Sequence, residues 1–281
     1  MKKLLSGILL VMILIITSSP TYAATTQIKI DGVTIVSDVN PESRSNRTMV
    51  PLRVISENLG ANVKWADSQI TLTKNDMKVI LKLNSNKVVK NGKTEQLNVK
   101  PYMKKNRTFV PMRFIAETFG SNVDYKNGTV TVDTKPFVID GVKIKAMQYE
   151  YHMTMGGVIQ QMKGNSYNEA IYNTFIENKG SKVEAPSDYT WSFSTTIPGG
   201  YYKSGQYDFL DQEGNSVERF DIYSLVRGFD EKSSSQPKIL IHDATENQWY
   251  LFSEAASKSI GQLFDRASMN GFVTVISNTV V

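Results

Sequence analysis

The chain has 281 residues and no cysteine, which suits about two domains and excludes disulfide-rich scaffolds and thiolate metal sites. Its charge is divided unevenly. Residues 24–135 carry 18 Lys and Arg against 10 Asp and Glu, a net charge of +8, whereas residues 136–281 carry 12 against 17, a net charge of −5. A basic half favours anionic partners such as wall polymers, acidic glycans or lipids. Lysines that serve only for solubility explain it equally well.

The first 23 residues have the pattern of a secretory signal peptide. Lys2 and Lys3 precede an apolar run from Leu4 to Ile16, and a small-x-small cleavage pattern ends at Ala23. The run is shorter than the roughly 20 residues that span a bilayer. We therefore predict that the mature chain starts after this segment and is secreted, either extracellular or in the cell wall. Together with the absence of cysteine, this suits a Gram-positive bacterium. An uncleaved membrane anchor is the alternative.

One pattern occurs twice in the basic half, sixty residues apart. "NRTMVPLRVISENLG" covers residues 46–60 and "NRTFVPMRFIAETFG" covers residues 106–120. Each copy predicts a turn, a short extended segment, a helix that begins at a proline (Pro51 or Pro111), and a stop at a glycine (Gly60 or Gly120). Two strands follow each copy: "ANVKW" and "QITLT" after the first, "SNVDY" and "GTVTV" after the second. Between the copies, "MKVILKL" and "NKVVKNGKTEQL" predict further strands, the second with a turn at Asn91-Gly92.

Each predicted helix has one apolar stripe at i, i+3, i+7 spacing. The stripes are Leu52, Ile55 and Leu59, and Met112, Ile115 and Phe119. A single strand–helix–strand–strand unit has too little core to fold alone. We therefore predict a duplicated α+β module over residues 24–135, in which two units bury their stripes against a shared sheet.

An arginine stands in the first turn of each helix, where the helix dipole disfavours a cation by about 0.3–1 kcal/mol. A glutamate follows each arginine at i+4, within reach of an ion pair. We interpret Arg53 with Glu57, and Arg113 with Glu117, as structural clamps onto the neighbouring strand. The alternative is that the arginines hold an anionic ligand.

The doubled "NRT-x-VP-x-R" pattern with its downstream Glu, Gly and Val resembles the copper amine oxidase N-terminal-like domain. This stalk module occurs in many secreted proteins of Gram-positive bacteria, often as a pair of half-repeats. The match covers about residues 26–134, and it implies a location and an architecture rather than oxidase activity. The copper site of an amine oxidase needs three histidines and a modified tyrosine, but the chain has only His152 and His242. We therefore expect no amine oxidase chemistry, no metal and no cofactor.

Residues 136–281 predict a separate α+β domain that is rich in antiparallel strands and resembles no family. The predicted elements are a hairpin over 137–151, a helix over 166–178, strands over 189–195, 201–226 and 237–252, a helix over 253–269 and a buried strand over 272–281; a mobile loop is predicted over 230–237. No hydrolase elbow, metalloprotease helix or phosphate-binding loop is present.

Two histidines of this half stand near carboxylates. Glu150 and His152 would share one face of a strand, and His242 precedes Asp243. If they met, they would offer a zinc site, but hydrogen-bonded histidines at strand ends are the favoured interpretation. The aromatic residues suggest a sugar-stacking platform, with core and rim positions favoured instead; they are Trp191, Tyr201, Tyr202, Tyr207, Trp249 and Tyr250.

These observations predict a secreted or cell-envelope-associated protein without enzymatic function. Its basic module would bind an anionic cell-wall polymer or glycan through exposed lysines: Lys78 and Lys82 on one strand face, and Lys104 and Lys105 before the second "NRT" turn. Its second domain would contact a protein or glycan. We expect no nucleic-acid partner and no membrane span after signal cleavage. One alternative is an envelope enzyme, a wall glycan or peptide hydrolase, that uses the module as a targeting arm. Another is a module for oligomerisation.

Overall fold

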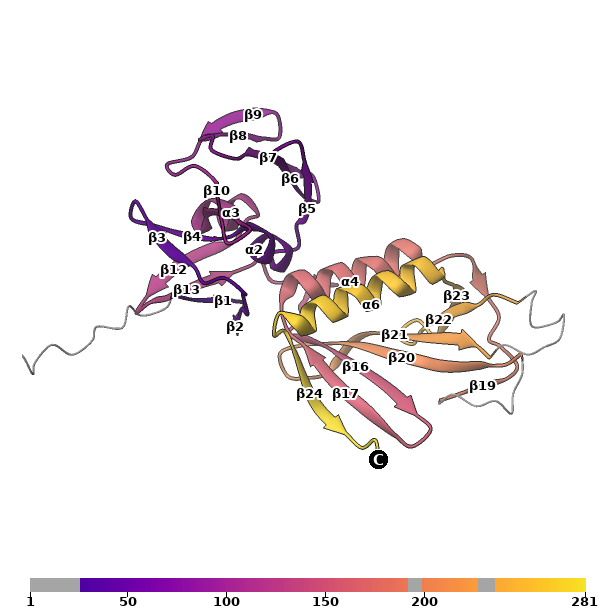
Figure 1. Ribbon diagram of the computed structural model, residues 1–281. Coiled ribbons are helices and arrows are strands. Elements are labelled where there is room, and N and C mark those ends of the chain that lie inside the picture. The colour runs from indigo at the N-terminus through magenta and orange to yellow at the C-terminus, as the bar shows by residue number, and fades with distance from the viewer. Residues whose placement is uncertain (1–25, 192–198, 227–235) are drawn as a thin grey trace, which may run out of the picture.

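The computed structural model describes residues 26–191, 199–226 and 236–281, which form two lobes (Figure 1). The N-terminal lobe ends near residue 135, and the C-terminal lobe holds the described residues that follow. The structure is mixed and strand-rich, which confirms the α+β class. The predicted signal peptide and residues 230–235 of the predicted loop lie outside the described residues.

The N-terminal lobe contains three sheets. A four-stranded sheet has the order β10-β11-β4-β3, with β3 (Glu42–Arg44), β4 (Arg47–Pro51), β10 (Tyr102–Lys104) and β11 (Arg107–Pro111). A second has the order β12-β13-β1-β2, with β1 (Gln27–Ile30), β2 (Val33–Thr34), β12 (Asn122–Lys126) and β13 (Thr129–Asp133). A five-stranded sheet follows chain order through β5 (Asn62–Ala66), β6 (Gln69–Lys74), β7 (Met77–Lys82), β8 (Lys87–Lys90) and β9 (Lys93–Gln96).

Two short helices directly follow the paired strands β4 and β11. They are α2 (Leu52–Asn58) and α3 (Met112–Thr118). Pro51 and Pro111 precede these helices by one residue, with φ near −60° and ψ of 116° and 121°. We predicted them inside the helix, but the φ that proline fixes suits both states, and here ψ keeps each proline in the strand. Gly60 and Gly120 end the helical segments with φ of 81° and 76°, as predicted.

The predicted apolar stripes face the core. Five of the six residues are at most 2% exposed, and Phe119 is partly buried against the same cluster. The two units meet where β4 pairs with β11 and Val50 lies opposite Val110. The expected shared sheet nevertheless holds only the first strand of each unit. Because β4 and β11 are antiparallel, the polypeptide leaves these two strands in opposite directions. The next strands, β5 and β12, therefore join different sheets. Duplication of the whole module therefore stays a prediction.

In its described residues, the C-terminal lobe contains a small hairpin, a nine-stranded sheet and two helices. The hairpin is β14 (Val138–Ile139) with β15 (Val142–Lys143). The sheet has the order β18-β23-β22-β21-β20-β16-β17-β24, and β19 pairs with β20. Its strands are β16 (Ala146–Met153), β17 (Gly156–Met162), β18 (Lys182–Val183), β19 (Tyr189–Thr190), β20 (Tyr201–Leu210), β21 (Ser216–Leu225), β22 (Ile239–Asp243), β23 (Gln248–Leu251) and β24 (Val273–Asn278).

Helices α4 (Asn165–Asn178) and α6 (Glu254–Met269) lie together on one face of this sheet (Figure 1). Both were predicted within a residue. The helix α6 begins at Ser253, whose hydroxyl accepts a hydrogen bond from the backbone N–H of Ala256 at 3.0 Å. It ends before Gly271, which has a left-handed φ of 87°. Tyr207 and Phe209 of β20 and Phe220 and Ile222 of β21 are buried in the main core cluster.

The final strand was predicted to be buried, and this was wrong. Among the described strands, β24 lies at the edge of the sheet and pairs with β17 alone. Val275 and Ile276 are each 55% exposed. A run of β-branched residues is typical of strands covered on both faces, but here the register shifts at Ile276 and an edge position leaves side chains uncovered.

Polar contacts join the two lobes. The Asp31 carboxylate, in the β1–β2 turn, accepts hydrogen bonds from the backbone N–H and the hydroxyl of Thr134 and from the backbone N–H of Asn165, at 2.8–3.0 Å. The Tyr167 hydroxyl on α4 donates to Asn58 Oδ1 on α2 at 2.8 Å, and this bond is buried. The start of α4 is therefore attached both to the β1–β2 turn and to α2 of the N-terminal lobe.

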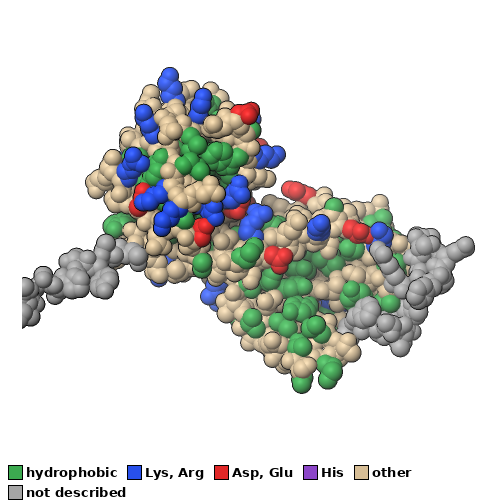
Figure 2. Space-filling view, viewed as in Figure 1, with side chains coloured by type: hydrophobic (Ala, Val, Ile, Leu, Met, Phe, Trp, Pro, Cys, Tyr) green, Lys and Arg blue, Asp and Glu red, His purple; other side chains and the backbone are tan. Residues whose placement is uncertain are grey.

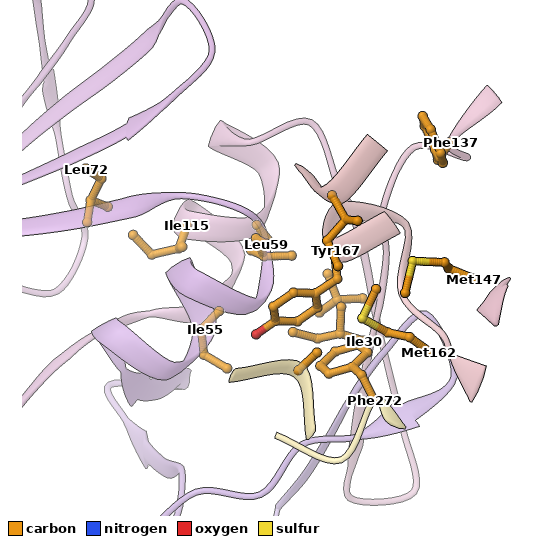
Figure 3. Packing of buried hydrophobic residues seen from close by; sticks show 14 of the residues in the cluster. Ile30, Ile55, Leu59, Leu72, Ile115, Phe137, Met147, Met162, Tyr167 and Phe272 are labelled. Atoms are coloured by element: carbon orange, nitrogen blue, oxygen red, sulfur yellow. The ribbon is translucent and has the colours of Figure 1, made fainter. Parts of the chain in front are cut away.

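Apolar contacts reinforce this junction. Ile30, Leu59, Tyr167 and Phe272 come from both lobes and belong to one buried cluster. Figure 3 shows Tyr167 and Phe272 close to Ile30, with Leu59, the residue after α2, nearby. The hydrophobic core thus continues from one lobe into the other.

Candidate functional site

The repeated Asn-Arg-Thr segments form the tips of two hairpins. In each tip, two consecutive residues have positive φ: Ser45 and Asn46 in the first, Lys105 and Asn106 in the second. This is the two-residue turn that matches strand twist, and asparagine tolerates it well. Each turn delivers an exposed arginine, Arg47 or Arg107, to the first position of its second strand.

A cavity of about 470 Å³ lies beside the first hairpin. Two arginines line it, Arg47 from the hairpin and Arg113 from the first turn of α3, together with one acidic residue, Glu117. Hydroxyl and amide side chains form much of the remaining wall, and Met112, Phe114 and Tyr125 add apolar surface; the polar residues are Thr26, Ser43, Asn46, Thr48, Gln96 and Asn98. Such a mixture of charged, polar and aromatic groups is typical of a small-ligand site.

The two arginines of the cavity differ in their partners. Arg113 Nε lies 3.7 Å from Glu117 Oε1, and both side chains are about 60% exposed. Exposed pairs of this kind contribute roughly 0–1 kcal/mol, so Arg113 is readily available to a ligand. Arg47 has no ion pair with any residue in the described ranges. The cavity therefore presents positive charge that the chain itself hardly compensates.

The predicted clamps are found as pairs within their own helices. Arg53 Nε lies 4.0 Å from Glu57 Oε1, and the second pair is the cavity pair already described. The structure records the i,i+4 contacts, whereas a clamp onto a neighbouring strand stays a prediction. The alternative interpretation was that these arginines bind an anionic ligand. Of the two arginines, Arg113 lines a cavity that could hold such a ligand.

The predicted lysines fall into two groups. Lys78 and Lys82 lie on the outer face of the five-stranded sheet, whose register also places Lys64 and Lys87 on that face. No acidic side chain belongs to this face within the five described strands. Figure 2 shows many Lys and Arg side chains on the visible side of the N-terminal lobe.

Lys104 and Lys105 lie apart from this face, at the second hairpin tip. Lys104 Nζ donates to Glu42, which also accepts a hydrogen bond from the Tyr102 hydroxyl. These contacts lower the pKa of Glu42, since Lys104 and Tyr102 both favour its charged form. The charge of Lys104 is therefore partly compensated, while Lys105 is exposed in the turn.

The histidines of the C-terminal lobe do not meet. His152 Nε2 lies 2.8 Å from Glu150 Oε1 on β16, whereas His242 on β22 lies 3.1 Å from Asn247 Oδ1. Strands β20 and β21 separate β16 from β22, which is three strand spacings, or about 14 Å. Within the described residues, no three His, Asp or Glu side chains are grouped to hold a metal ion.

The aromatic residues proposed as a platform are largely core. Tyr201, Tyr207, Trp249 and Tyr250 are between 4% and 7% exposed, and Trp191 is 37% exposed. Four of the six therefore stabilise the fold, in agreement with the favoured interpretation. Tyr189, which sequence reasoning missed, is 51% exposed beside Trp249.

Sequence reasoning also missed a buried network of charged side chains next to these rings. Asp221 is 1% exposed, and its Oδ2 accepts from Lys203 Nζ at 2.9 Å and from Arg219 at 3.1 Å. Lys203 lies 3.7 Å from the centre of the Trp191 ring. Burial lowers the pKa of Lys203, and Asp221 opposes that effect. The alternation of charged and apolar residues in β20 and β21 was the available signal.

A second buried carboxylate lies on the helix side of the sheet. Burial, together with the negative charge of the neighbouring Asp243, raises the pKa of Glu218 to about 7. Asp243 itself pairs with Lys179, at the end of α4, at 2.5 Å. Lys179 forms ion pairs with Asp243 and Glu246, and the carboxyl group whose pKa is raised is that of Glu218.

Comparison with known proteins separates the two lobes. Residues 29–134 match the family model of the copper amine oxidase N-terminal domain. The match confirms the resemblance of the basic half, and the C-terminal lobe matches no family. No curated protein and no solved structure matches the chain. The two cavity arginines, the two hairpins and the lysine face all lie within the matched residues 29–134. Of the helices in the described part, none has the length and apolar content needed to cross a membrane.

Proposed function

We propose that the protein is a secreted or cell-envelope-associated binding protein without enzymatic function, whose N-terminal lobe holds an anionic polymer of the cell wall. The observation that carries this proposal is the outer face of the five-stranded sheet, where Lys64, Lys78, Lys82 and Lys87 stand without an acidic side chain. Such a face creates a positive potential that attracts polyanions at long range.

The unequal charge of the two lobes also supports wall binding by the N-terminal lobe rather than the C-terminal lobe. The net charge of +8 belongs to residues 24–135 and that of −5 to residues 136–281. The acidic lobe is repelled by a polyanionic wall and is left free for a protein or glycan partner. The duplicated module would act as a stalk that holds this lobe at the wall.

Reversal of charge on the lysine face tests the proposal. Lys78→Glu, Lys82→Glu and Lys87→Glu together should abolish most co-sedimentation of the purified protein with cell walls. The matched control reverses three exposed lysines of the other lobe, Lys143, Lys163 and Lys258, and should retain binding with the same net charge.

The composition of the wall provides the second arm of this experiment. Walls stripped of teichoic acid and other anionic polymers should no longer bind the unmodified protein. If the lysine-face variant bound walls as well as its control, or stripped walls bound as well as intact ones, the lysines would serve solubility alone. Circular dichroism of both variants checks that folding is unchanged.

A further inference from the structure

The two hairpins of the N-terminal lobe are related by a local twofold arrangement, in which residues of one hairpin contact residues of the other. Val39 and Val99, which are sixty residues apart, are buried in one small cluster with Met49 and Phe109, which are also sixty apart. Val50 lies opposite Val110 at the centre of the pairing between β4 and β11. Residues at this spacing therefore occupy matching places around the paired strands β4 and β11.

The two hairpin arginines, Arg47 and Arg107, occupy matching places, but only Arg107 is paired with a carboxylate of the chain among the described residues. Asp38, immediately before Val39, accepts a hydrogen bond from Arg107 of the second hairpin at 2.5 Å. The counterpart of Arg107 is Arg47, and the counterpart of Asp38 is Asn98, immediately before Val99. Asn98 lines the 470 Å³ cavity together with Arg47. An amide has no charge, so Arg47 lacks the carboxylate that its counterpart has.

From this difference we propose that the cavity binds the carboxylate of an acidic sugar, which takes at Arg47 the place that Asp38 takes at Arg107. The site is part of the polymer-binding lobe proposed above, on which it rests, and it adds the chemical group that the lobe recognises. Arginine suits this group because its planar guanidinium donates two parallel hydrogen bonds to a carboxylate. Arg113 adds a second cation to the cavity lining.

The remaining wall favours a sugar as the carrier of that carboxylate. Hydroxyl and amide groups from Ser43, Thr48 and Gln96 are suited to hydroxyl-rich ligands. Tyr125 also lines the cavity and is 56% exposed, so that its ring is open to stacking against a pyranose face. A volume of about 470 Å³ lies within the range of small-ligand sites.

The comparison of Asp38 with Asn98 also supplies the decisive variant. Asn98→Asp should place an internal carboxylate on Arg47 and thereby exclude the ligand. Binding of tetragalacturonate to the purified protein, measured by calorimetry, should weaken by about tenfold or more in Asn98→Asp, as expected for loss of a charge-assisted pair. Arg47→Ala should weaken binding similarly.

Controls separate the site from net charge. Asn75→Asp, in the exposed β6–β7 turn, adds the same charge away from the cavity and should bind as the unmodified protein does. Methyl-esterified tetragalacturonate should bind poorly. Oligo(glycerol phosphate) should bind more weakly than tetragalacturonate and should respond less to Asn98→Asp.

The outcomes distinguish this inference from the proposed function. If walls bind the protein but tetragalacturonate does not, or if both Asn98→Asp and Arg47→Ala bind it normally, the carboxylate site is wrong and the lysine face stands. If tetragalacturonate binds as described but walls do not, the site stands and the proposed function fails. A preference for the phosphate oligomer would overturn carboxylate recognition.

Discussion

Truncation of a stripe residue tests whether the core is continuous. Ile115 lies on α3 and is fully buried in the cluster that also contains residues of the C-terminal lobe. Ile115→Ala removes buried methyl and methylene groups and leaves a cavity, which should lower the free energy of unfolding by about 2–5 kcal/mol. For a protein of this size, each kcal/mol lowers the melting temperature by about 2–4 °C.

Differential scanning calorimetry measures this effect for the whole chain. Because Leu59, Tyr167 and Phe272 join the two lobes in one core, the protein should melt in a single transition that moves as a unit. Ile55→Ala, at the matching position on α2, should behave alike. Val36→Ala, at a position 63% exposed, should change little. Two transitions, of which only one moves in Ile115→Ala, would refute the reasoning.

Three further predictions concern the junction, the buried carboxylates and the signal segment. Tyr167→Phe removes the buried hydrogen bond to Asn58 and should destabilise the protein by about 1–3 kcal/mol in urea unfolding, with Tyr172→Phe, on the same helix, as the comparison. The pKa of Glu218, about 7 when folded and near 4.5 when unfolded, means that the folded state binds the extra proton, so stability should fall as pH rises through 5 to 7. In Glu218→Gln this fall should be absent. Between pH 5 and pH 8 the free energy of unfolding of the unmodified protein should therefore drop by on the order of 1–3 kcal/mol more than that of the variant. Equal dependence of the free energy of unfolding on pH in both proteins would contradict the assignment. Mass spectrometry of secreted material should find Ala24 at the N-terminus, whereas full-length chain in the membrane fraction would show an uncleaved anchor.

Local structure followed closely from the sequence. The helices that follow Pro51 and Pro111, their glycine stops and the long helix after Ser253 all depend on nearby residues, whose backbone preferences act within one turn. Sheet partners depend on distant residues instead. The separation of β5 and β12 into different sheets, and the edge position of β24, follow from how strands pair across the chain.

In the candidate site, too, features that depend on nearby residues were predicted from the sequence, and features that depend on distant residues were not. Sequence spacing identified Arg113 and the exposed Lys78 and Lys82, because helix and strand periodicity fix their faces. It did not identify Arg47, since the cavity arises where the first hairpin meets the second helix. The compensation of Lys104 by Glu42 was also hidden, because those residues meet only through the folded hairpins.

Titration of the purified protein with a purified anionic wall polymer, at 0.1 M and at 1 M salt, tests the central claim most directly. Over this range the Debye length shrinks from about 10 Å to about 3 Å, which screens exposed lysines from the polymer. The account predicts clear binding at 0.1 M salt and a large loss of affinity at 1 M salt. No binding at 0.1 M salt, or an affinity that salt leaves unchanged, would contradict it.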